Sequence, residues 1–154
     1  MSELINIIII FILLLLVIFI TFYKYDSNRK IKYTIENHYK IHDIIKKNIE
    51  NCDSGKKNNL EEIFVVNLDD FCNINYTNKD ILKLISVFNN LFENINICNL
   101  YKSNVKNKCI SAVINKDIKN ISNGETIISL VDNRFQIKTQ ISSSKNITNI
   151  INLK

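Results

Sequence analysis

The chain has 154 residues, enough for one domain of ordinary size and too few for two domains with separate cores. Ile, Asn and Lys, whose codons are AT-rich, occur 31, 25 and 18 times and make up nearly half of the chain, so the composition reflects an AT-rich genome before it reflects function. Two glycines, at 55 and 124, exclude the glycine-rich loops that bind phosphates, and a net charge of +5 spread over dispersed lysines argues against a nucleic-acid interface.

Residues 4–23 predict a transmembrane helix. The segment has no charged residue and consists almost entirely of Ile, Leu, Val and Phe. At about 1.5 Å per residue its length matches the ~30 Å hydrocarbon core of a bilayer. A cleaved signal peptide is disfavoured, because no Lys or Arg precedes the apolar run and no small-residue cleavage site ends it. We therefore expect a single-pass membrane protein held in lipid by residues 4–23, with residues 1–3 as a short tail.

Basic residues follow the apolar segment closely, whereas its N-terminal side carries only the α-amine and Glu3. The basic residues are Lys24, Arg29, Lys30 and Lys32. By the positive-inside rule, this asymmetry keeps the C-terminal bulk of the chain on the cytosolic side.

Residues 24–51 are assigned to a juxtamembrane stalk helix, with a short hinge predicted at residues 26–28 before the helical seam. Its seam has alternating spacings of four and three, as in a heptad pattern. The seam residues are Ile31, Ile35, His38, His42, Ile45 and Ile49. The stalk either continues from the membrane helix or packs on the head. A polar, turn-rich stretch at 51–59 marks the start of the head, assigned to residues 52–154.

His38 and His42 are four residues apart and so share one face of the stalk helix. The simpler interpretation is a partly exposed pair that covers the edge of a helix contact. The sharper hypothesis is a pH-sensitive contact with a partner, because protonation near pH 5 to 6 would place two like charges in an apolar seam. A metal site would need further ligands, and no nearby residue supplies them convincingly.

The head is expected to have an α+β fold. A strand is predicted at 63–66, followed by an amphipathic helix at about 79–95 that serves either as a core helix or as a partner-binding helix. A hairpin is predicted from strands 126–131 and 134–141, with Asp132-Asn133 as its turn.

The C-terminal residues predict one more helix. Ser143 or Ser144 would cap a short final helix that buries Ile147, Ile150 and Ile151.

Four cysteines, Cys52, Cys72, Cys98 and Cys109, are an even number that favours two disulfides. The helix at 79–95 would hold Cys72 and Cys98 some 26 Å apart, so we expect Cys52 to pair with Cys72 and Cys98 with Cys109. Disulfides conflict with a cytosolic head. The conflict is resolved if the orientation rule fails, if the thiols stay reduced, or if the system makes disulfides on the cytosolic side. Free buried thiols and, more weakly, a metal site are the alternatives.

No catalytic signature is found in the sequence. It lacks Gly-x-Ser-x-Gly and His-Glu-x-x-His, and both histidines belong to the stalk pattern. The adjacent acidic pairs 61–62 and 69–70 point in different directions on a helix or a strand. We therefore expect no enzyme activity, no metal, no cofactor, and neither nucleic acid nor a small molecule as a partner.

The whole-chain plan, an uncleaved anchor, a juxtamembrane helix and a small cysteine-containing head, resembles the small N-terminally anchored subunits of the poxvirus entry-fusion complex. The composition best suits the insect poxviruses. Residues 96–98 and 109–113, Asn-Ile-Cys and Cys-Ile-Ser-Ala-Val, are similar to the paired-cysteine segment near the C-terminus of one such subunit.

The resemblance implies a virion membrane protein that is oxidised on the cytosolic side by a virus-encoded thiol pathway and acts in membrane fusion with other anchored subunits. This would reconcile the predicted orientation with disulfides. Two other interpretations remain open: an anchored structural or scaffold protein of an AT-rich virus or cell, and an oral-infectivity envelope factor of a large insect DNA virus.

Overall fold

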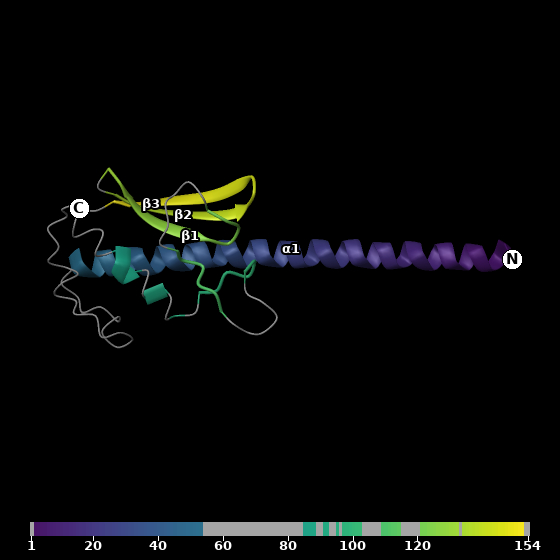
Figure 1. The fold of residues 1–154 in the computed structure, drawn as a ribbon. Coiled ribbons are helices and arrows are strands. Elements are labelled where there is room, and N and C mark those ends of the chain that lie inside the picture. The colour runs from purple at the N-terminus through teal and green to yellow at the C-terminus, as the bar shows by residue number, and fades with distance from the viewer. Residues whose placement is uncertain are drawn as a thin grey trace.

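A computed structural model gives the architecture of the chain (Figure 1). The structure describes residues 2–53, 85–88, 91–92, 95, 97–102, 109–114, 121–132 and 134–152. The predicted strand at 63–66, most of the predicted helix at 79–95, and Cys72 lie outside these ranges. The described residues combine one long helix with a three-stranded sheet, which confirms an α+β fold.

Helix α1, Ser2–Asp53, runs without a break through the predicted membrane segment and the predicted stalk. Its 52 residues extend about 78 Å at 1.5 Å per residue. The hinge predicted at 26–28 is therefore wrong. The Asp26 carboxylate lies 3.1 Å from Arg29 Nη2 and 2.7 Å from Lys30 Nζ, and partners three and four residues ahead stabilise helix at this polar position. The two cations also hold the pKa of Asp26 below its ordinary value, with the Lys30 hydrogen bond as the largest cause.

The sheet consists of β1 (Thr126–Val131), β2 (Arg134–Ser142) and β3 (Lys145–Asn152), antiparallel in the order β1-β2-β3. The predicted hairpin is confirmed, since Val131 pairs with Arg134 across the turn. Asp132 has a φ of 50°, the left-handed conformation that a tight hairpin turn requires and that Asp tolerates.

The final helix predicted after Ser143 or Ser144 is wrong, because this segment forms β3. The two serines form the turn between β2 and β3, and Ile151 pairs with Phe135 in the ladder. The β-branched residues of the segment favour a strand. As a strand β3 buries Ile151 and leaves Ile150 51% exposed, whereas the predicted helix would have buried both.

The sheet lies along the C-terminal half of α1, while the N-terminal half projects beyond the head (Figure 1). Between Thr34 and Ile49, buried residues recur every three or four positions of α1, as expected for a helix that packs on a sheet with one face. Its buried residues are Thr34, Asn37, His38, Ile41, Ile45, Asn48 and Ile49. The sequence left open whether the stalk continues the N-terminal helix or packs on the head. In the structure it does both. The head assigned to 52–154 therefore shares its core with α1.

The inner face of the sheet alternates along β2, where Phe135, Ile137, Thr139 and Ile141 are buried. Residues 85–88 and 91–92 are helical, and the Phe88 ring packs edge-on against Phe135 at 6.1 Å between centroids. Phe88, Leu91 and Phe92 belong to the same core as Ile41 and Ile45. For its described residues, the predicted helix at 79–95 is a core helix.

Candidate functional site

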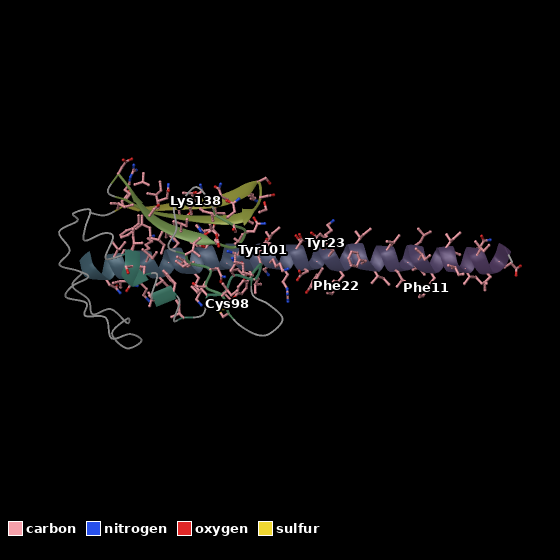
Figure 2. The ribbon with its side chains drawn as sticks, viewed as in Figure 1. Phe11, Phe22, Tyr23, Cys98, Tyr101 and Lys138 are labelled. Atoms are coloured by element: carbon pink, nitrogen blue, oxygen red, sulfur yellow. A yellow bond between two sulfur atoms is a disulfide. The ribbon has the colours of Figure 1, made fainter. Side chains whose placement is uncertain are left out.

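The N-terminal half of α1 is apolar and exposed to solvent along its length. Large hydrophobic side chains between Leu4 and Tyr23 are 49–71% exposed, and Figure 2 shows Phe11, Phe22 and Tyr23 projecting from this part of the helix. The helix is long and apolar enough to cross a membrane. Within the described part of the chain it is a candidate membrane anchor, as predicted.

The head is attached to α1 close to the end of the apolar segment. The Tyr101 hydroxyl donates to the Ile141 carbonyl oxygen at 3.0 Å, and Lys30 Nζ lies 6.0 Å from the centroid of the Tyr101 ring. Burial raises the pKa of Tyr101, so the phenol stays protonated and keeps its donor. Lys30 is seven residues beyond Tyr23, about 10 Å along the helix. Little space therefore separates the head from a membrane that contains residues 4–23.

The predicted disulfide between Cys98 and Cys109 is confirmed, with the two Cα atoms 5.1 Å apart. The segments next to the two cysteines also pair through their backbones: Asn99 N donates to Ile110 O at 2.7 Å, and Ala112 N donates to Ile97 O at 2.8 Å. Asn37 Nδ2 of α1 donates to the Cys98 carbonyl oxygen at 3.1 Å, so the bridge is fastened to the helix. Cys52 lies in the last turn of α1 and Cys72 outside the described residues, so their pairing stays a prediction.

Loss of this disulfide is expected to destabilise the head. The bridge closes a loop across a sequence separation of 11 residues, and a loop of that size corresponds to about 3 kcal/mol of chain entropy in the unfolded state. We expect Cys98→Ser with Cys109→Ser to lower the free energy of unfolding by roughly that amount, measured by guanidinium unfolding in micelles. Reduction of the wild-type chain and of the double variant, compared side by side, separates the loss from this bridge from any loss that other cysteines cause. An unchanged midpoint would contradict the prediction.

A buried polar cluster that the sequence analysis missed lies beside the disulfide. Asn99 is 1% exposed; its Nδ2 donates to Asn123 O at 3.1 Å and its Oδ1 accepts from Tyr101 N at 2.9 Å. Gly124 has a φ of +79°, and a Cβ there would lie 2.8 Å from Asn99 Cγ. The Asn-Gly pair at 123–124 is a turn signal that could have indicated this site.

Glu125 completes the cluster and is 1% exposed. Its carboxylate pairs with Lys102 and accepts a hydrogen bond from Ser122 N at 2.8 Å. The paired carboxylate ties the 101–102 turn to the start of β1, so its role is structural.

The two stalk histidines, His38 and His42, lie in different surroundings. His38 is fully buried against the sheet of its own chain, where its Nδ1 lies 2.8 Å from Thr139 Oγ1. Thr139 Oγ1 in turn lies 2.7 Å from Thr126 Oγ1. His42 is at the rim, with its side chain 18% exposed and Nδ1 3.0 Å from Asp43 Oδ1. His38 contacts its own chain and His42 is partly exposed. The predicted pH-sensitive contact of the two histidines with a partner stays a prediction.

No group of three or more His, Cys, Asp or Glu side chains able to hold a metal is present among the described residues. The comparisons with protein-family models, with curated proteins and with solved structures found no match. The features available for a functional interpretation are therefore the candidate anchor, the head attached directly above it, and the buried polar interface between α1 and the sheet.

Proposed function

We propose that the protein is a membrane-anchored component of a multiprotein entry/fusion apparatus of a virus and that it acts through protein-protein contacts during membrane fusion. The observation that carries the proposal is the continuity of α1, in which one helix supplies both the candidate anchor and part of the core of the head. A head built in this way is presented at a fixed height above a bilayer, where neighbouring anchored subunits lie.

The Cys98–Cys109 bridge supports the viral part of the proposal. Lys24, Arg29 and Lys30 follow the apolar segment and favour a cytosolic head, in which a disulfide is unusual. A viral thiol-oxidising pathway on the cytosolic side satisfies both features. The partners are then membrane lipid, contacted by residues 4–23, and the other anchored subunits, and the location is the virion membrane.

The proposal is tested in two steps on membranes from cells that make the full chain. Carbonate extraction should leave the intact protein in the membrane pellet, and its N-terminus should map before residue 20. Release of the protein, or an N-terminus beyond residue 20, would contradict the anchor.

The second step uses virus particles with and without the protein. Particles that lack it should still bind cells but fail in lipid mixing with the target membrane. The control is a chain in which residues 4–23 are replaced by an unrelated apolar helix of equal length, which should restore lipid mixing if the head carries the contacts. Normal lipid mixing without the protein would favour the structural or scaffold role instead.

A further inference from the structure

We propose that His38 is an acid-sensitive latch that holds the β1–β3 sheet on α1. The inference is independent of the proposed function, because it rests on contacts within the chain. His38 lies in the middle of the buried face of α1 and hydrogen-bonds to the inner face of the sheet, where its partner is Thr139. The hydroxyl of Thr126 extends this contact to β1, so one imidazole connects α1 with two strands.

The hydrogen bonds around the ring suit its neutral form. Nδ1 has Thr139 Oγ1 as its partner at 2.8 Å, whereas Nε2 is buried and has no hydrogen-bond partner among the described residues. In the neutral ring with the proton on Nδ1, Nε2 is an unprotonated acceptor, the less costly group to leave unpaired. Protonation turns the ring into a buried cation, and the hydrogen bond with the Asn149 side chain offsets only part of the cost. Burying such a group is strongly unfavourable.

Among the residues that the structure describes, no acidic side chain pairs with the ring. On α1, His42 is one turn further along and becomes positive on protonation itself, and its nearest acid, Asp43, is its own partner at 3.0 Å. The ring of Tyr39, also on α1, lies nearly perpendicular to the imidazole at 5.4 Å between centroids. From the sheet, the groups facing His38 are uncharged.

These uncharged groups are Thr126 on β1, Thr139 on β2 and Asn149 on β3. The residues beside Thr139 on the same face of β2 are Ile137 and Ile141, both buried. Glu125, the acid next to Thr126 in the chain, pairs with Lys102 instead. A proton on His38 would therefore be placed in a buried interface that holds no carboxylate for it among the described residues.

The pKa of His38 agrees with this geometry. Burial is the largest influence and lowers the pKa below 6.5, a hydrogen bond with the Asn149 side chain raises it, and the charge of His42 lowers it again. Since the unfolded state binds the proton more tightly than the folded state, the contribution of His38 to stability is complete above pH 6.5. It declines as the pH falls from 6.5 through the lower folded-state pKa. Acid thus loosens the sheet from α1.

The test uses the full chain in micelles or nanodiscs, and it benefits from the fact that the chain has only two histidines. In His42→Gln, one imidazole remains, and its nitrogen resonances report the tautomer and the titration of His38 directly. We expect a neutral ring at pH 7.4 with the proton on Nδ1, and titration below pH 6.5.

Amide exchange in β2 reports whether the sheet is released. Between pH 7.4 and 5.0, protection of the amides of Ile137 and Thr139, corrected for intrinsic exchange, should fall about tenfold for each unit by which the folded-state pKa is depressed, up to a limit of about thirtyfold at pH 5.0. His38→Asn, which keeps a polar atom near the Nδ1 position, should show no such fall, while His42→Gln should retain it.

Three outcomes would overturn the latch: titration of His38 at or above pH 6.5, titration without loss of protection, or an equal loss in His38→Asn. If His38→Asn does not fold, the His42→Gln chain decides alone, because it carries both readouts.

Discussion

A chain that begins at residue 52 is expected to remain unfolded, whereas a chain that begins at residue 26 is expected to give a folded, soluble head. The shorter chain lacks the buried face of α1, including Ile41 and Ile45, which are both 0% exposed. Burying each of these side chains contributes roughly 1.5 to 3 kcal/mol, so losing several removes most of the 5 to 15 kcal/mol that stabilises an ordinary domain.

Amide dispersion in two-dimensional NMR and cooperative guanidinium unfolding distinguish the two chains. The chain from residue 26 is the matched control, because it removes the exposed apolar half of α1 and keeps the Asp26 ion pairs. A dispersed spectrum from the chain that begins at residue 52 would show that the sheet and the 85–113 region form a core without α1.

Phe135→Ala is expected to lower the free energy of unfolding by about 3 to 5 kcal/mol. Phe135 is fully buried, belongs to the same core cluster as Ile41 and Ile45, and meets the Phe88 ring edge-on. The truncation therefore leaves a cavity in the core that α1, β2 and Phe88 share.

The control for Phe135→Ala is Ile150→Ala on the same sheet, where the side chain is 51% exposed and the loss should stay below about 1 kcal/mol. Both are measured by guanidinium unfolding of the full chain in micelles. Equal losses for the two variants would contradict the proposed position of the core.

The sequence was sufficient to predict those parts of the fold that depend on residues close together in the chain. The hairpin followed from Asp132-Asn133 between two β-rich runs, and the Cys98–Cys109 pair followed from the length of the helix before it. The hinge at 26–28 was predicted wrongly because polar residues usually mark a break. Here Asp26 finds its cations within the next turn of the same helix.

The final segment was predicted wrongly because its pattern suits both kinds of structure. Spacings of three and four among Ile147, Ile150 and Ile151 suit a helical face, yet Ile147 and Ile151 also share one face of a strand. The ladder with β2 decided between them, since it pairs the backbone of β2 along its length. Such pairing is set by tertiary structure, and periodicity alone does not show it.

The candidate site could be predicted from the sequence only in part, because its contacts also depend on tertiary structure. The sequence placed His38 in a helical seam, but its partner Thr139 lies 101 residues away. The seam also omitted Ile41, which is fully buried, and included His42, which lies at the rim. Asn99 and Glu125 contact residues that lie 24 and 23 positions away in the chain, a separation over which no local spacing rule applies.

The unbroken α1 has a mechanical consequence. Because no flexible joint separates the apolar segment from the helix inside the head, tilting the segment in a bilayer tilts the head through the same angle. Ile49 lies 26 residues beyond Tyr23, about 39 Å along the axis, so a tilt of about 20°, ordinary for a membrane helix, displaces that end sideways by about 13 Å. Any change in the tilt of the candidate anchor would therefore move the head sideways relative to neighbouring membrane proteins.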